Sequence, residues 1–90
     1  MNKLYTHAWF TLGCAYMRVE NFQKAVYAFG NVVSIDVKQG DSWANLATCY
    51  IQLQKPKEAM TCLDQGVKFK RTNPKIWENL IILSIEAKYF

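Results

Sequence analysis

The sequence has very little of what catalytic and metal sites are usually built from. His7 is the only histidine among the 90 residues, no glycine-rich phosphate loop is present, and no carboxylates are paired across an obvious cleft. A lone histidine that no motif connects to a serine or cysteine is more often a packing or surface residue than a catalyst. The sequence therefore disfavours an enzyme and predicts neither a metal nor a cofactor.

The cysteines do not form a framework either. Cys14, Cys49 and Cys62 are odd in number and include no C-x-x-C pair, so neither a disulfide scaffold nor a zinc ribbon is predicted. Free cysteine is among the most often buried residue types. We therefore expect Cys49 and Cys62 to act as small apolar fillers near the core.

Long hydrophobic runs are also missing. No stretch approaches ~20 apolar residues, and no charged start leads into an apolar run and a cleavage site. We therefore expect no membrane partner and an intracellular location, cytoplasmic or nuclear, and the length of 90 residues allows one domain.

What the sequence does have is regularity. Trp9, Trp43 and Trp77 stand at equal intervals, and that interval equals the length of a two-helix solenoid repeat, ~34 residues. The first tryptophan is followed, at the spacings of a known repeat signature, by Leu12, Gly13, Tyr16, Ala25 and Phe29. The second is followed at the same spacings by Leu46, Ala47, Tyr50, Ala59 and Leu63. The third unit keeps Leu80 but has Ile81 and Ser84 where a small residue and a tyrosine are expected.

On these residues the chain resembles the tetratricopeptide repeat family over essentially its whole length. The resemblance implies an all-α, right-handed superhelical solenoid of antiparallel helix hairpins with about two and a half repeats. It divides a single array into a repeat at 6–39, a repeat at 40–73 and a half repeat at 74–90. The strings WFTLGCAY, WANLATCYI and IWENL resemble a large eukaryotic member, which implies a segment of a long, non-catalytic scaffold.

The apolar spacing predicts five helices, near residues 6–19, 22–35, 41–53, 56–69 and 74–87. In the first helix a stripe at intervals of three and four is expected to be buried. It consists of Trp9, Leu12, Tyr16 and Val19. A matching stripe on the fourth helix contains Ala59, Met60, Leu63 and Val67. Gly13 and Ala47 are expected where the helices of a hairpin approach most closely.

Polar residues mark the expected helix starts. Asn21, Asp41 and Asn73 are predicted to cap helices, and Pro56 and Pro74 suit the first helical position because proline lacks an N–H donor.

The ends of the sequence carry an expectation of their own. Solenoids need polar caps, whereas this sequence starts almost directly with a repeat and stops before the second helix of its third unit. We therefore expect a piece of a longer array. The residues expected to face a missing helix are Ile76, Leu80, Leu83 and Ala87. An isolated copy could then self-associate through its uncapped C-terminal end.

The resemblance also implies a binding surface. In this family the first helix of each hairpin lines a concave groove that binds a peptide or helical segment of a partner protein. Mapped onto this sequence, the groove residues are Phe10, Cys14, Met17, Asn45, Thr48, Ile51, Gln52, Lys75, Asn79 and Ile82, with His7 and Asp41 at the same face. We expect apolar anchors among them and expect Asn45 and Asn79 to hold the backbone of the partner. The apolar members could instead only pack against neighbouring repeats.

Two other kinds of partner are less well supported. Chaperone-binding members grip an acidic tail with five polar residues, of which only Asn45 and Lys75 match here, so we predict negligible affinity for such a tail. Nucleic acid is the alternative partner, since the net charge is +4 and the basic residues Lys68, Lys70, Arg71 and Lys75 cluster. It is disfavoured because cations are common at helix carboxyl ends and the aromatic residues are expected in the core.

Overall fold

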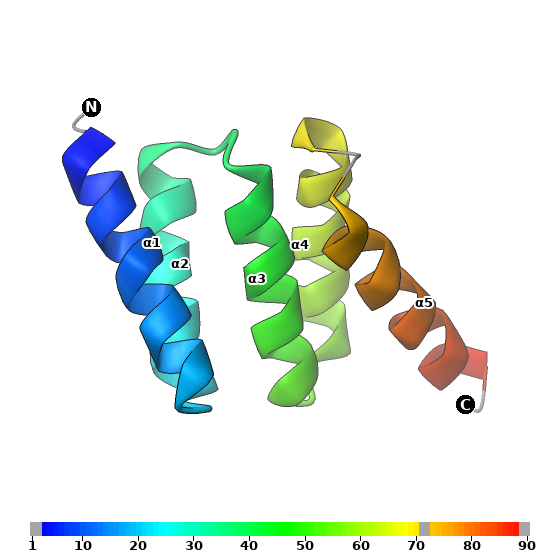
Figure 1. The fold of residues 1–90 in the computed structure, drawn as a ribbon. Coiled ribbons are helices and arrows are strands. Elements are labelled where there is room, and N and C mark those ends of the chain that lie inside the picture. The colour runs from blue at the N-terminus through cyan, green and yellow to red at the C-terminus, as the bar shows by residue number, and fades with distance from the viewer. Residues whose placement is uncertain (1–2, 71–72, 89–90) are drawn as a thin grey trace.

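The structure, a computed structural model, describes residues 3–70 and 73–88 and contains all five predicted helices (Figure 1). They are α1 (Lys3–Arg18), α2 (Phe22–Ile35), α3 (Gly40–Gln52), α4 (Pro56–Phe69) and α5 (Pro74–Lys88). No strand occurs within these two described ranges. The predicted all-α class is confirmed, whereas the hand of the superhelix and the repeat boundaries stay predictions.

The helices form two complete hairpins and one further helix. α1 packs antiparallel against α2, α3 packs antiparallel against α4, and α2 packs against α3 to join the hairpins. In Figure 1 α1, α3 and α5 lie on the near side, with α2 and α4 behind them. α5 packs against α3 and α4 near its start and leans away from them toward its C-terminal end. One face of the array is therefore lined by the first helix of each unit.

Both hairpins close through the same turn. Glu20 and Gln54, which stand one repeat length apart, have left-handed backbones with φ of 60° and 61°. After each of them a backbone N–H reaches back five residues, from Asn21 to the Tyr16 carbonyl at 2.9 Å and from Lys55 to the Tyr50 carbonyl at 2.8 Å. This is the Schellman arrangement that satisfies the free carbonyls at a helix end. The sequence repeat is thus a repeat of backbone conformation as well.

Most predicted helix starts are observed. Asn21 Oδ1 accepts from the Lys24 amide at 3.3 Å, Pro56 and Pro74 begin their helices, and Asn73 Oδ1 accepts from the Lys75 amide at 2.9 Å.

The predicted cap at Asp41 is wrong. α3 begins at Gly40, so Asp41 lies inside the first turn. Its carboxylate instead accepts hydrogen bonds from Lys70, at the end of α4, and from Asn73, just before α5.

Small residues allow the helices of each hairpin to approach closely, as predicted. A methyl group on Gly13 would lie 2.8 Å from carbons of the Phe29 ring, which is fully buried. Ala47 takes the equivalent place in the second hairpin and is also fully buried. The core around them is formed by Ala25, Phe29, Ala44, Leu46, Ala47, Cys49, Ala59, Cys62, Leu63, Ile76 and Leu83. It includes Cys49 and Cys62, as expected.

The predicted stripes are buried less completely than expected. Val19 is 71% exposed, and Leu12 and Met60 are also exposed, because each lies at the edge of its stripe or at a helix end. Trp9 and Trp43 are not fully buried. Trp9 packs edge-on against Tyr27 at 5.7 Å, and Trp43 Nε1 donates to the Val37 carbonyl at 2.7 Å.

The prediction for the face of α5 is wrong by part of a helical turn. Ile76 and Leu83 are buried and Leu80 packs against the core, so these residues face α3 and α4 rather than a missing helix. The exposed apolar residues of α5 are Trp77, Ile81, Ile82 and Ile85. The side chains of Ser84, Glu86 and Ala87 are not among those described. Trp77, the third of the evenly spaced tryptophans, is therefore exposed rather than buried as expected.

Candidate binding groove

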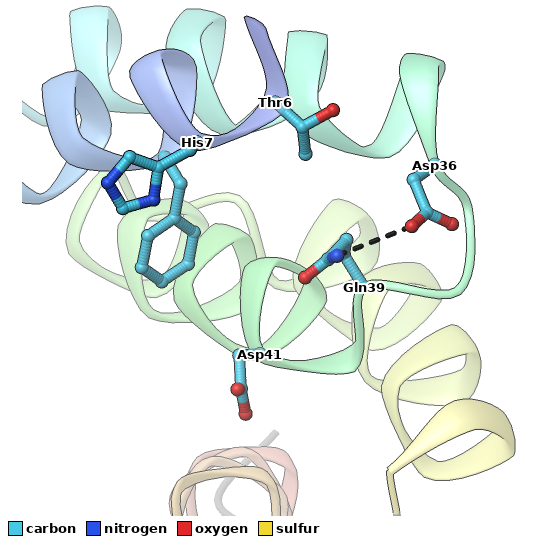
Figure 2. Close-up of a pocket in the computed structure, with 6 residues that line it drawn as sticks. Thr6, His7, Asp36, Gln39 and Asp41 are labelled. Atoms are coloured by element: carbon cyan, nitrogen blue, oxygen red, sulfur yellow. Dashed lines mark hydrogen bonds between the residues drawn. The ribbon is translucent and has the colours of Figure 1, made fainter. Parts of the chain in front are cut away.

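A pocket opens at the junction between the first and second hairpins. Its volume is about 490 Å³, and it lies between the start of α1, the α2–α3 connection and the start of α3 (Figure 2). The lining residues are Thr6, His7, Phe10, Asp36, Gln39 and Asp41. Figure 2 shows His7 and Asp36 on opposite sides, with Gln39 between them. The pocket joins the predicted groove positions of α1 to a connection that the sequence did not mark as functional.

The α2–α3 connection that forms one wall is held by Asp36. One carboxylate oxygen accepts from the Lys38 amide at 3.1 Å, and the other accepts from Gln39 Nε2 at 3.3 Å. These bonds fix the connection locally as an Asx-type turn, in which a short side chain replaces a backbone partner. This wall of the pocket is therefore held by hydrogen bonds within the α2–α3 connection itself.

Four of the five apolar residues at the predicted groove positions lie between the groove and the core. Phe10, Cys14, Met17 and Ile51 are partly buried and pack against the core. The Phe10 ring meets the Phe29 ring edge-on, with centroids 5.6 Å apart. Each residue thus packs against the repeats and also keeps some exposed surface, so packing is confirmed and a role in binding stays a prediction.

A polar network closes the junction between α3 and α5. Lys75 Nζ donates to Asn45 Oδ1 at 3.1 Å, and Asn79 Nδ2 donates to Thr48 Oγ1 at 3.0 Å and to the Ala44 carbonyl at 3.3 Å. Asn45 and Asn79 are both buried. The structure brings these four predicted groove residues together, but as a bridge between helices. Their use in holding the backbone of a partner stays a prediction.

The network continues to the start of α5. Asp41 accepts from Asn73 Nδ2 at 2.6 Å and pairs with Lys70 at 3.1 Å. Both charged side chains are about half exposed, and such a pair is worth ~0–1 kcal/mol. Of the predicted basic cluster, Lys70 and Lys75 thus have partners within the chain, Lys68 lies over the Phe69 ring at 6.0 Å, and Arg71 falls outside the described residues. This engagement adds no support for the nucleic-acid alternative.

The remaining predicted groove residues, Gln52 and Ile82, are exposed. The two residues that match the chaperone clamp, Asn45 and Lys75, are hydrogen-bonded to each other. The structure therefore leaves the prediction of negligible affinity for an acidic tail unchanged.

Burial determines how readily the thiols of Cys49 and Cys62 ionise. It raises the pKa of Cys49 to about 11 and that of Cys62 to about 12, and it also raises the pKa of the Tyr50 hydroxyl. All three groups are therefore neutral near pH 7, and the two thiols are unsuited to act as nucleophiles.

In residues 3–70 and 73–88 no three His, Cys, Asp or Glu side chains gather as metal ligands. No described helix has the length and apolar character that a membrane span requires.

Sequence reasoning missed part of the site. Thr6, Asp36 and Gln39 were not predicted to line a groove, because two of them lie in the connection between units rather than on a first helix. A signal was present in the repeat itself. Gln39 stands one repeat length before Asn73, which bridges to Asp41 of the preceding unit. The last residue before each of these two first helices thus faces the junction.

Comparison with known proteins agrees with this architecture. A family profile described as tetratricopeptide repeat matches residues 16–80. A TPR repeat-containing protein of Schizosaccharomyces pombe is 33% identical over 97% of the chain, and the match covers 11% of that protein. Tetratricopeptide repeat-containing protein trd-1 of Caenorhabditis elegans is 32% identical over 91% of the chain and 11% of its own length. The protein named Essential for maintenance of the cell wall protein 1 of Saccharomyces cerevisiae is 34% identical over 87% of the chain and 9% of its length.

The chain thus spans about a tenth of the length of these curated relatives. The constant repeat length, the repeated hairpin turn and the profile match lead to one conclusion. The chain belongs to the tetratricopeptide repeat family.

Proposed function

We propose that this chain is a protein-interaction scaffold whose groove binds a peptide or helical segment of a partner protein. Tetratricopeptide repeat proteins are generally interaction scaffolds. The observation that carries the proposal here is the open pocket of about 490 Å³ beside Phe10. Its size falls within the ~300–1,000 Å³ range of ligand-binding pockets.

The character of the groove supports a peptide ligand. Phe10, Met17 and Ile51 are partly buried apolar residues of the predicted groove, and His7 and Gln52 are exposed polar residues of the same face. Peptide recognition commonly combines a few buried apolar anchors with polar groups that fix register. The neutral buried thiols and the single histidine offer no comparable support for catalysis.

A peptide screen tests the proposal. The purified chain is incubated with an immobilised library of 12-residue peptides, and Kd values of the selected peptides are measured by fluorescence anisotropy. We expect Gln52→Ala, at an exposed groove position, to weaken binding by about fivefold, the loss of ~1 kcal/mol typical of a contributing interface residue. The matched control Gln23→Ala changes a glutamine on α2, away from the groove, and should leave Kd unchanged.

Two results would contradict the proposal. The first is a library without any peptide above background. The second is a set of peptides that Gln23→Ala weakens as much as Gln52→Ala does.

A further inference from the structure

The pocket at the first junction has an excess of negative charge. Its described lining residues include two carboxylates, Asp36 and Asp41, and no lysine or arginine. Asp41 forms an ion pair with Lys70 at 3.1 Å, which offsets its charge. Asp36 has no ion pair within the part of the chain that the structure describes, and its two donors, the Lys38 backbone amide and Gln39 Nε2, are neutral. One negative charge in the pocket is therefore uncompensated.

The Asp36 carboxylate can accept further hydrogen bonds. An ionised carboxylate has about four lone-pair sites, and the Lys38 amide and Gln39 Nε2 occupy one on each oxygen. Asp36 is also partly buried, so water and salt screen a new charge pair there less than on an open surface. An arginine guanidinium donates parallel N–H bonds to both oxygens of a carboxylate. The unused lone pairs therefore suit a guanidinium.

The opposite wall of the pocket offers apolar surface. Phe10 belongs to α1, whereas Asp36 lies in the α2–α3 connection, and both line the pocket. The Phe10 ring is held edge-on against the Phe29 ring at 5.6 Å and is only partly buried. Figure 2 shows His7, also of α1, on the side away from Asp36. Arginine lays its methylene stem on apolar surface and its guanidinium interacts well with aromatic rings, so both parts of its side chain find partners here.

The second junction has the opposite charge. Its charged groove residue is Lys75, which donates to the neutral amide oxygen of Asn45. A cationic ligand is therefore attracted to the first junction and repelled at the second. The chain as a whole carries a net charge of +4, which favours acidic peptides over basic ones. A preference for arginine would thus have to come from local contacts in the pocket.

We propose that the partner segment inserts an arginine into this pocket, where its guanidinium donates to Asp36 and its methylene stem lies on Phe10. The proposal names the ligand chemistry at one end of the groove, and it rests on the proposed peptide-binding function. Lysine fits less well, because its ammonium is a compact point charge that cannot donate two parallel bonds.

The test starts from the peptides selected from the library, among which arginine should recur at one position. In the strongest binder that arginine is replaced by citrulline, which has nearly the same shape without the charge. In the chain, Asp36→Asn keeps an oxygen that can accept from the Lys38 amide, so the turn is retained. The matched control Asp64→Asn removes the same charge from an exposed site on α4, which contributes no described residue to the pocket.

We expect citrulline in the peptide and Asp36→Asn in the chain each to raise Kd about tenfold, the effect of losing a hydrogen bond between charged groups. The two changes together should raise Kd no further, because both remove the same contact. Replacing the arginine by lysine should raise Kd about threefold, since one of the parallel bonds is lost. Asp64→Asn should leave Kd unchanged.

The outcomes distinguish this proposal from the function on which it rests. A library without any binding peptide overturns both. Peptides that bind without a recurring arginine, or that bind equally well with citrulline or lysine in its place, overturn the arginine proposal alone. Losses that multiply when citrulline and Asp36→Asn are combined would place the guanidinium on another residue. A loss for Asp64→Asn equal to that for Asp36→Asn would assign the effect to overall charge, and either result also overturns the proposal.

Discussion

The two junctions between successive units use equivalent positions but are built from different interactions. Between α1 and α3 the groove positions carry Phe10 and Cys14, which pack on the core, and no hydrogen bond joins the described side chains of these two helices. Between α3 and α5 the equivalent region is tied by the bonds of Lys75 and Asn79. The first junction packs through apolar side chains and has a pocket with a mostly polar lining at one end, while the second is polar and bridged by hydrogen bonds.

This difference separates two kinds of repeat position. Positions inside the hairpins keep small residues on the first helix and large apolar residues on the second, because close packing restricts their size. Positions on the groove face are free to change, because they need only satisfy their own polar groups or a ligand. The groove of a single short array can therefore have one part that holds the array together, and we propose that the other part binds a partner.

The largest expected effect is in the core of the first hairpin, on which Phe10 of the apolar junction packs. Phe29→Ala removes the ring that packs on Phe10 and Gly13, and it should lower the free energy of unfolding by about 3–5 kcal/mol. Urea denaturation measures the loss. The control Tyr27→Ala, on the exposed side of the same helix, should cost about 1 kcal/mol through its edge contact with Trp9. Equal losses would show that the ring does not hold the two helices of this hairpin together.

The second-largest effect is expected at the polar junction between α3 and α5. Asn79→Ala removes two largely buried hydrogen bonds, to Thr48 Oγ1 and to the Ala44 carbonyl, and at about 0.5–1.5 kcal/mol for each bond it should cost about 1–3 kcal/mol. The comparison variant is Asn31→Ala, which removes a single exposed bond to the Tyr27 carbonyl and should cost about 0.5 kcal/mol or less. A loss for Asn79→Ala no larger than this would mean that the bridge contributes little.

A smaller effect compares one repeat position in two units. Gly13→Ala forces a methyl group against the Phe29 ring, and the strain of ~1–3 kcal/mol is partly offset by ~1 kcal/mol of better helix propensity. We expect a net loss of about 1 kcal/mol by thermal or urea unfolding. Ile81→Ala at the equivalent, exposed position should change stability by less than about 0.5 kcal/mol. A stabilising Gly13→Ala would contradict the close approach in the first hairpin.

The smallest effect is expected at the two hairpin turns, where the complete units share the same left-handed backbone conformation. Glu20→Gly and Gln54→Gly place glycine at the two left-handed turn positions. A non-glycine residue costs roughly 1–2 kcal/mol in this conformation, whereas glycine brings an entropic cost of ~0.5–1 kcal/mol. Each variant should therefore gain about 0.5–1 kcal/mol, and the two gains should match. A clear difference in melting temperature between the two variants would show that the hairpin turns are not equivalent.

The sequence is sufficient for the architecture because the repeat period is a property of local spacing. Helix existence, the turn after each first helix and the close approach at Gly13 all follow from residues within one unit. The failures lie where a residue depends on another unit. The prediction misplaces the exposed face of α5 because its degenerate unit has Ile81 and Ser84 in place of the signature residues. Asp41 does not cap its helix because it bonds instead to Asn73, 32 residues away.

The groove shows the same limit. Its residue positions follow from the repeat, but the sequence does not reveal that Asn45 and Asn79 bridge two helices, since their partners are 30 and 31 residues away. Nor does it reveal the pocket wall at Asp36 and Gln39. Pairing between distant residues depends on how the units stack, which no single unit encodes.

The most direct test of this account maps where a bound peptide lies. The strongest peptide from the library is titrated into isotope-labelled chain, and backbone amide shifts are followed by NMR. We predict that the largest changes fall at the first junction, on residues such as Thr6, His7 and Gln39, while Thr48 and Asn79 change little. Shifts concentrated at the α3–α5 bridge, or on the outer surface of α2 and α4, would contradict the division of the groove into an open and a bridged junction.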